Sequence, residues 1–208
     1  MDKREHWQGV YCGRAEHALS WFEDEPARSL EALIPALAPG DPVIDIGGGA
    51  SRLVVRLMAL GFGPVTVLDL SEQALELART RLGKAASQVK WICADVTLWR
   101  PDTSYLAWHD RAVFHFLIDA PDRAAYVGNM CAATRPGAVA VILTFDEDGP
   151  ETCSGLPVKR YSPQALRAEI DHLAPGRFAF LDAERFDHLT PQGNIQKFQM
   201  TRLRRLPD

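Results

Sequence analysis

The chain has 208 residues, of which 47% are hydrophobic, and this length and composition predict one domain with a substantial buried core. The formal net charge of −4 argues against nucleic acid or an anionic membrane surface as a partner. Because the four cysteines are widely separated and no apolar run is long enough to cross a bilayer, we expect a cytoplasmic protein without disulfides, a metal or a membrane span.

The first 40 residues are predicted to be helical, and residues 28–37 have the pattern of an amphipathic helix that ends near Pro39-Gly40. From residue 41 onward, strand patterns alternate with helical patterns. The predicted strands are 42–46, 65–69, 89–93, 105–109 and 138–145, and the predicted helices between them are 51–60, 71–83 and 121–134. This alternation favours an α/β fold with a doubly wound sheet and helices on both faces.

The C-terminal part has a different pattern. A predicted helix at 162–172 is followed by two long strands, about 177–187 and 195–204, and the proline and glycine in 190–194 favour a hairpin between them. The chain is therefore predicted to form a seven-stranded, mostly parallel sheet with one antiparallel strand near its edge.

The most informative segment is 42–51, whose pattern is typical of a buried strand that ends in a glycine turn and leads into a helix. Gly47, Gly48 and Gly49 remove the Cβ atoms where the chain must turn sharply, and they let a ligand approach the backbone. Such a turn commonly forms the floor of a nucleotide-type cofactor site.

A carboxylate recurs at the ends of three successive predicted strands, namely Asp45, Asp69 and Asp95. The carboxyl ends of parallel strands share one edge of an open sheet, where ligands bind. Asp69 lies 24 positions after Asp45, where a βαβ unit places an acid that accepts hydrogen bonds from both ribose hydroxyls. Asp95 is expected to accept a hydrogen bond from the adenine amine. Helix capping stays open as the alternative role of Asp45 and Asp95.

A dinucleotide cofactor is disfavoured by one residue. Aligning the turn with the G-x-G-x-x-G pattern places Arg52 at the third glycine, where close helix–strand packing excludes a long side chain. A cofactor without a pyrophosphate does not need that register, so an NAD-dependent reductase is only a distant alternative.

Three segments resemble motifs of the class I S-adenosylmethionine-dependent methyltransferases. Residues 45–51 (Asp-Ile-Gly-Gly-Gly-Ala-Ser) resemble motif I, residues 68–71 (Leu-Asp-Leu-Ser) motif II and residues 93–96 (Cys-Ala-Asp-Val) motif III. Residues 135–137 (Arg-Pro-Gly) resemble the family's loop before the fifth strand. The resemblance implies a Rossmann-like fold and S-adenosylmethionine as the cofactor, with S-adenosylhomocysteine as the product.

The resemblance also implies positions for the parts of the cofactor. Gly47 and Gly49 would flank its methionine part, Asp69 would hold the ribose, and Asp95 and Val96 would meet the adenine.

Two N-terminal segments, 7–11 and 20–22, resemble the aromatic lid of such enzymes, although core packing of these aromatic residues is an equal alternative. Residues 1–40 would then be a helical lid and residues 41–208 a Rossmann-like core, within a single methyltransferase domain. The full set of expected cofactor contacts is Asp45, Gly47, Gly48, Gly49, Asp69, Leu70, Asp95, Val96, Tyr11 and Trp21.

The segment 108–117 places histidine, aspartate and arginine side chains at the rim of the predicted sheet. An arginine there can orient an anionic or π-rich acceptor, and a histidine can act as a base. We therefore expect Arg111, His115 and Asp110 to be catalytic. The structural alternative is that Asp110 and Arg111 pair with each other and that His115 is a satisfied helix residue.

The segment 108–117 and residues 121–126 partly resemble stretches of the thiopurine S-methyltransferases. A similar stretch occurs in some protein-lysine methyltransferases, and Ala112 stands where both have a glycine.

These features predict methyl transfer by an SN2 reaction to a small molecule, with a thiol or another soft nucleophile preferred. The alternatives are a protein-lysine methyltransferase and a non-catalytic module that binds a cofactor or a partner. No nucleic acid or membrane partner is expected, and the sequence leaves monomer and homodimer open.

Overall fold

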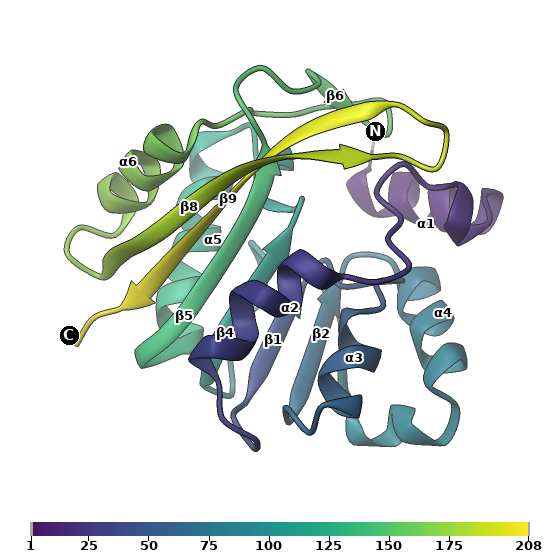
Figure 1. Ribbon diagram of the computed structural model, residues 1–208, viewed down its shortest axis with the longest axis horizontal. Coiled ribbons are helices and arrows are strands. Elements are labelled where there is room, and N and C mark those ends of the chain that lie inside the picture. Colours follow the sequence, from purple (N-terminus) through teal and green to yellow (C-terminus); the bar gives the residue numbers. More distant parts are fainter. Residues whose placement is uncertain (1, 208) are drawn as a thin grey trace.

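The described residues form a central seven-stranded sheet with helices on both faces (Figure 1). The structure is a computed structural model that describes residues 2–207. The strand order is β3-β2-β1-β4-β5-β9-β8. The strands are β1 (Val43–Ile46), β2 (Val65–Asp69), β3 (Lys90–Cys93), β4 (Tyr105–Arg111), β5 (Thr134–Phe145), β8 (Phe178–Leu189) and β9 (Ile195–Arg205).

The strand directions confirm the predicted architecture. Strands β1 to β5 pair in parallel, whereas β9 is antiparallel to both of its neighbours, β5 and β8. The order of the parallel strands reverses at β1, with β2 on one side and β4 on the other. The carboxyl end of β1 is therefore a topological switch point, where open α/β sheets bind ligands.

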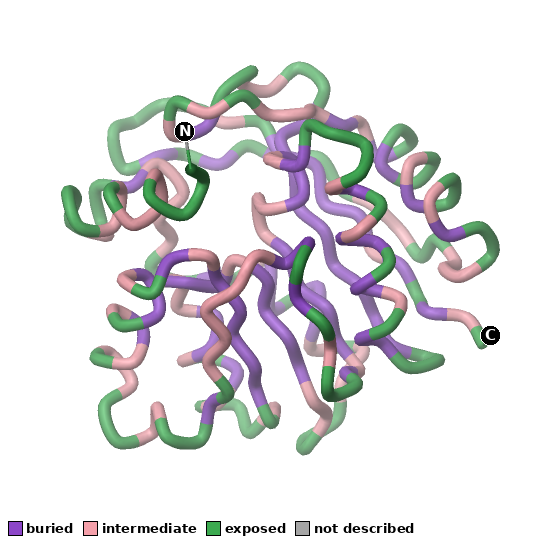
Figure 2. Tube along the Cα trace, turned by 180° about the vertical axis from the view of Figure 1, so that it is seen from behind, coloured by how far each residue is buried: buried purple, intermediate pink, exposed green. Residues whose placement is uncertain are grey.

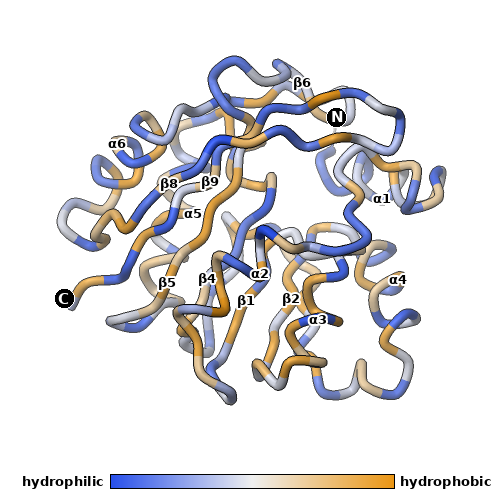
Figure 3. Tube along the Cα trace, viewed as in Figure 1, coloured by the Kyte–Doolittle hydropathy of each residue, from blue (hydrophilic) through white to orange (hydrophobic). Residues whose placement is uncertain are grey.

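Two hydrophobic clusters, one on each face, hold the helices against the sheet. Consecutive residues of β1 point to opposite faces of the sheet, so Val43 packs in the first cluster and Ile44 in the second. The helices are α1 (Lys3–Gly13), α2 (Ala27–Leu33), α3 (Leu53–Ala59), α4 (Glu72–Leu82), α5 (Ala120–Ala133) and α6 (Pro163–Leu173). Helices α2, α3 and α4 contribute to the first cluster, and α5 and α6 to the second. Figure 3 shows the resulting hydrophobic centre of the sheet and the more polar edge strand β8.

Several element boundaries differ from the predictions. Strand β4 continues to Arg111 instead of ending at residue 109, because Asp110 and Arg111 still pair with Ile142 and Leu143 of β5. Strand β5 begins at Thr134, so the predicted loop 135–137 lies inside it, beside a break in register with β4. A small hairpin, β6 (Thr152–Cys153) and β7 (Leu156–Pro157), follows β5 in a segment for which no strand was predicted.

The middle strands of the sheet are mostly buried, as Figure 2 shows, whereas the edge strand β3 is only partly buried. All four residues of β1 are buried, which fits the apolar, β-branched pattern that predicted this strand. Within residues 2–207, no helix is both long and apolar enough to cross a membrane.

Candidate functional site

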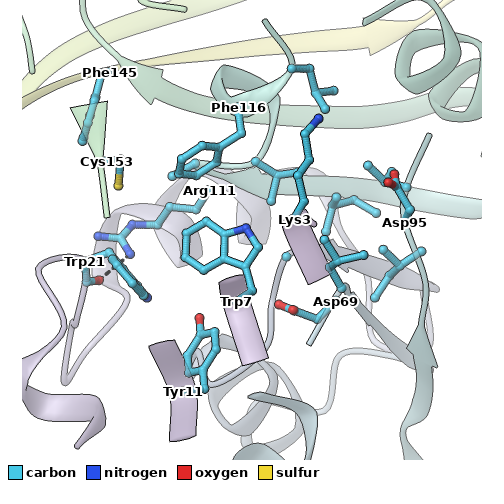
Figure 4. A pocket seen from close by; sticks show the side chains of 18 of the residues that line it. Lys3, Trp7, Tyr11, Trp21, Asp69, Asp95, Arg111, Phe116, Phe145 and Cys153 are labelled. Carbon is cyan, nitrogen blue, oxygen red and sulfur yellow. Dashed lines mark hydrogen bonds between the residues drawn. The ribbon is translucent and has the colours of Figure 1, made fainter. Parts of the chain in front are cut away.

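The carboxyl ends of the parallel strands surround a pocket, and α1 supplies part of its wall (Figure 4). One side of it, the glycine end, consists of Gly47, Asp69, Leu70, Asp95 and Val96. The other side, the arginine end, consists of Arg111, Phe116, Phe145, Cys153, Gln196 and Phe198. Tyr11 and Trp21 also line the pocket, so many of the sequence-predicted residues come together here.

A second, adjoining cavity lies behind the glycine turn. Asp45 and Gly48 line it, and it shares Tyr11, Trp21, Gly47 and Arg111 with the first pocket. Of the remaining predicted residues, Gly49, Asp110 and His115 line neither space.

The glycine turn is shaped by close approaches of side chains to its backbone. Gly47 adopts a positive φ of 65°, which favours glycine, and its N–H donates to the carbonyl of Leu68 at 2.7 Å. A Cβ atom at Gly48 would overlap the carboxylate of Asp45, and one at Gly49 would overlap that of Asp69. Side chains at these two positions would therefore push the two carboxylates out of place.

Asp69 is buried at the end of β2, and its Oδ1 accepts the N–H of Ser71 at 2.8 Å. Burial raises the pKa of Asp69 to about 7, and the neighbouring Asp45 acts in the same direction. The backbone N–H groups of Ser71, Gly49 and Leu70 oppose this rise. The carboxylate thus lacks enough donors to offset its burial, and further donors from a ligand would stabilise its charge.

The segment after β3 is fixed by its own side chains. Asp95 Oδ1 accepts the N–H of Thr97 at 2.8 Å and the hydroxyl of Thr97 at 2.7 Å, so this oxygen fixes a turn at residues 96–98. Residues 94–104 contain no helix, so Asp95 does not cap one. The amide of Asn129 on α5 donates to the carbonyl of Val96 at 2.7 Å. These contacts hold Asp95 and Val96 in the pocket wall.

Arg111 lies at the end of β4 and points toward the N-terminal segment. Its Nη1 donates to the carbonyl of Trp21 at 2.7 Å, and its Nη2 is 2.9 Å from a carboxylate oxygen of Glu23 (Figure 4 shows the first contact). The guanidinium also lies 5.8 Å from the ring centroid of Phe198. Arg111 therefore pairs with Glu23. The structural alternative, in which Arg111 pairs with its neighbour Asp110, is wrong.

Asp110 is fully buried and organises the turn that follows β4. Its two oxygens accept the N–H groups of Val113 at 2.8 Å and Phe114 at 3.0 Å, and Oδ2 accepts the hydroxyl of Tyr126 at 2.6 Å. Burial raises the pKa of Asp110 to about 6. These three donors come from the protein itself, and Asp110 does not belong to the pocket lining.

His115 is also fully buried, in a single 3-10 turn at Phe114–Phe116. Its Nδ1 accepts the N–H of Phe145 at 3.2 Å, which joins this turn to the end of β5. Burial lowers the pKa of His115 to about 3, so the imidazole is neutral at physiological pH.

An aromatic cluster closes the pocket from the N-terminal side. Trp7 of α1 makes edge-to-face contacts with Trp21 at 5.7 Å and Phe116 at 5.1 Å between ring centroids. Gln8 fastens α1 to α4, because its Oε1 accepts the hydroxyl of Ser71 at 2.6 Å and the N–H of Gln73 at 2.9 Å. The aromatic residues of the predicted lid thus do line the pocket.

Residues 43–137 match the family described as "Methyltransferase domain", and this range carries the glycine turn, Asp69, Asp95 and Arg111. Residues 43–137 are thus similar to a methyltransferase domain.

The chain is also similar to curated proteins and to solved structures. The chain is 33% identical over 177 residues to a trans-aconitate 2-methyltransferase of Rhodopseudomonas palustris. The match covers 79% of this chain and 64% of the relative. It is 25% identical over 128 residues to an eEF1A lysine and N-terminal methyltransferase homolog of Drosophila melanogaster, which covers 60% of this chain and 19% of the relative. The chain spans between 46% and 65% of the length of the trans-aconitate methyltransferases that it matches.

The likeness in fold extends beyond the range that the family model matches. The N-methyltransferase NodS of Bradyrhizobium japonicum, solved in complex with S-adenosylhomocysteine, superposes with a TM-score of 0.73 at 15% identity and covers 100% of both chains. This likeness shows that the chain has the class I methyltransferase fold, with the Rossmann-like sheet that the sequence predicted. Among residues 2–207, no group of three or more His, Cys, Asp or Glu side chains is arranged to hold a metal ion.

Proposed function

We propose that the protein transfers a methyl group from S-adenosylmethionine to a small, anionic acceptor molecule. The observation that carries this proposal is the continuity of one pocket from the glycine end to the arginine end. The glycine end would hold the donor and the arginine end the acceptor. The pocket would then align the two for an in-line displacement.

The glycine end suits this donor for two reasons. The bare backbone at Gly48 and Gly49 leaves Asp45 and Asp69 where a nucleoside with an amino-acid tail can reach both. The buried carboxylate of Asp69, whose pKa is about 7, gains from the two hydroxyl donors of a ribose. S-adenosylmethionine would bring an electrophilic methyl group on its sulfonium, while Asp69, Leu70, Asp95 and Val96 bind and orient the adenosine.

The acceptor class follows from the ionisable groups at the arginine end. Burial raises the pKa of Cys153 to about 12, and Arg111 is a cation. Tyr11, elsewhere on the pocket wall, also has its pKa raised well above the usual value by burial. Among residues 2–207, the arginine end thus holds no side chain that readily takes a proton at neutral pH. An acceptor that arrives already ionised, such as a carboxylate or a thiolate, needs no such base.

Arg111 would then orient the acceptor, and it is our candidate for the residue that contacts it. We propose positioning roles for Asp110 and His115, since both are buried in protein contacts behind the pocket. The relatives named for trans-aconitate, a small carboxylic acid, support a carboxylate acceptor. The partial resemblance to thiopurine S-methyltransferases supports a thiol.

Binding and turnover test the donor and the acceptor separately. Calorimetry with S-adenosylhomocysteine should show binding to wild type and a loss on the order of 10- to 100-fold in Asp69→Ala, because a charge-assisted contact is removed. Undiminished affinity in this variant would contradict the donor assignment. A panel of carboxylic acids, thiols, amines and phenols is then assayed for methylated product, with Arg111→Ala as the comparison.

Lysine methylation is the second candidate, because one relative is named for it. Labelled methyl groups appearing in polypeptides of a denatured lysate, and in no member of the small-molecule panel, would favour it. Binding of S-adenosylhomocysteine without turnover of any acceptor would favour a non-catalytic module. Methylation of a carboxylic acid or thiol, with loss in Arg111→Ala, would support the proposal.

A further inference from the structure

The wall around the arginine end of the pocket is largely aromatic. Its rings belong to Trp7, Trp21, Phe116, Phe145 and Phe198, of which Figure 4 labels all but the last. Trp7 contacts two of the others edge to face, and the ring centroids of Phe145 and Phe198 lie 4.8 Å apart. Aromatic rings that stack or meet edge to face gain more than the burial of their area alone. The wall therefore favours an acceptor with a planar, aromatic body.

The charges around the arginine end balance one anionic group. Within residues 2–207, the cations that line the pocket are Arg111 and Lys3, and Lys3 pairs with an acid of α5 at 3.0 Å. Arg111 pairs with Glu23 at 2.9 Å. Arg111 and the sulfonium of the donor would bring two positive charges against the one negative charge of Glu23, which leaves one charge for the acceptor. Any further carboxylate on the acceptor would lose its hydration without gaining a partner.

Gln196 supplies a second polar group at this end. It lies on β9 two residues before Phe198, so the two side chains lie on the same face of the strand, and both line the pocket. Gln196 Oε1 is buried and finds no hydrogen-bond donor in the described part of the chain. Since buried polar atoms in folded proteins nearly always have a partner, a donor group of the ligand would fill this role. A hydroxyl or an amino group on the acceptor meets this requirement.

We infer that the acceptor is an aromatic carboxylic acid with one negative charge, and that its hydroxyl or amino substituent donates a hydrogen bond to Gln196. The inference rests on the proposed function, because it assumes that the arginine end holds the acceptor. Arg111 pairs with the carboxylate, the aromatic wall packs against the ring, and Gln196 selects the substituent. The inferred acceptor differs from trans-aconitate, after which relatives of this chain are named, since trans-aconitate carries three carboxylates and no ring.

Calorimetry of acids binding to the complex with S-adenosylhomocysteine tests the inference. The acids are the positional isomers of hydroxybenzoate, benzoate, cyclohexanecarboxylate and trans-aconitate. In wild type, the tightest hydroxybenzoate should bind roughly three- to tenfold better than benzoate, because it gains one neutral hydrogen bond. Benzoate should bind roughly two- to tenfold better than cyclohexanecarboxylate, which has the same charge but no aromatic ring. The affinity for trans-aconitate should be on the order of 100-fold below that for the tightest hydroxybenzoate.

Two substitutions at Gln196 separate its hydrogen bond from its packing. Gln196→Leu should abolish the preference for hydroxybenzoate over benzoate and leave the affinity for benzoate within about twofold of wild type. Gln196→Glu keeps an oxygen that accepts, so it should keep the preference while its added charge weakens both acids on the order of tenfold. The matched control is Gln164→Leu at an exposed position of α6, which should bind all the acids as wild type does. Gln196→Glu keeps the test decisive if Gln196→Leu does not fold.

The outcomes separate the two proposals. If wild type binds no S-adenosylhomocysteine, or methylates no carboxylic acid or thiol, the proposed function fails and the inference fails with it. If trans-aconitate is methylated and binds at least as tightly as every hydroxybenzoate, the inference fails and the proposed function stands. An unchanged preference for hydroxybenzoate in Gln196→Leu overturns the inference in the same way. The predicted order of the acids in wild type, together with loss of that preference in Gln196→Leu, supports both.

Discussion

Asp69 shows how one residue can couple ligand binding to pH. Ribose hydroxyls donate best to the ionised carboxylate, and burial raises the pKa of this group to about 7. The binding-competent form therefore gains population as the pH rises through 7. This coupling is a property of the folded protein, since an exposed aspartate is ionised throughout this range.

We predict that the affinity for S-adenosylhomocysteine rises about tenfold between pH 6 and pH 8, in proportion to the ionised fraction of Asp69. Calorimetry at several pH values measures this dependence. Asp69→Asn is the matched variant, because it keeps the shape but does not titrate, and its weaker affinity should be flat over the same range. An equal pH dependence in wild type and variant would assign the effect to another group.

The residues of the glycine end could be predicted from the sequence because each follows its own strand within a few positions. Asp69, Asp95 and the glycine turn are local features, and the sheet topology brings them together. The wall of the arginine end has no such signal. Phe145 and Phe198 meet through the antiparallel register of β5 and β9, which the local pattern of either strand does not contain.

The buried polar contacts were beyond prediction for the same reason. Ser29 Oγ on α2 lies 2.9 Å from His109 Nε2 on β4, although the two residues are 80 positions apart, and a serine in an amphipathic helix resembles many others. Asp110 and His115 are the opposite case, because the sequence predicted catalytic residues and neither side chain lines the pocket. Their residue types indicated chemistry, but whether such side chains face a pocket or the protein interior depends on the strand end and on the turn that follows it.

At the scale of elements, α1 is fastened over the pocket by few polar contacts. Gln8 alone supplies the acceptor for both Ser71 and Gln73 at the start of α4, and Lys3 pairs with Asp122 of α5 at 3.0 Å. None of the residues of α1 is fully buried. Segments with few buried contacts open at low free-energy cost, so α1 is suited to admit and retain ligands.

We predict that Gln8→Leu loosens α1 while leaving the sheet intact. Losing the two hydrogen bonds should speed amide exchange in residues 3–13 on the order of 30-fold, because each bond contributes about 1 kcal/mol. Hydrogen-exchange mass spectrometry measures this change. Glu5→Gln, at an exposed position of the same helix, is the control and should exchange as wild type does. Unchanged exchange in Gln8→Leu would mean that the aromatic contacts alone hold the helix.

For the molecule as a whole, His115 links stability to pH. Its pKa in the folded state is about 3, whereas an exposed histidine in the unfolded chain takes a proton near pH 6.5. Below pH 6.5 the unfolded state therefore binds a proton that the folded state does not. The free energy of unfolding falls as the pH drops from 6.5 toward 3.

We predict that His115→Asn weakens this acid sensitivity. The Asn side chain carries an acceptor oxygen near the position of Nδ1, so it can keep the contact with the N–H of Phe145 but does not titrate. Urea unfolding at pH 7, 6, 5 and 4 should show a smaller loss of stability per pH unit in the variant than in wild type. Parallel curves would show that other groups dominate the acid response.

The place of β9 between β5 and β8 has a consequence for the order in which the two ends of the pocket are built. A nascent chain emerges from the ribosome N-terminus first. The glycine end and Asn129, which holds Val96, have been made once residue 129 has emerged, whereas the arginine end waits for Gln196 and Phe198, almost seventy residues later. During synthesis, the part of the molecule that we assign to the donor can therefore take shape before the part that selects the acceptor exists.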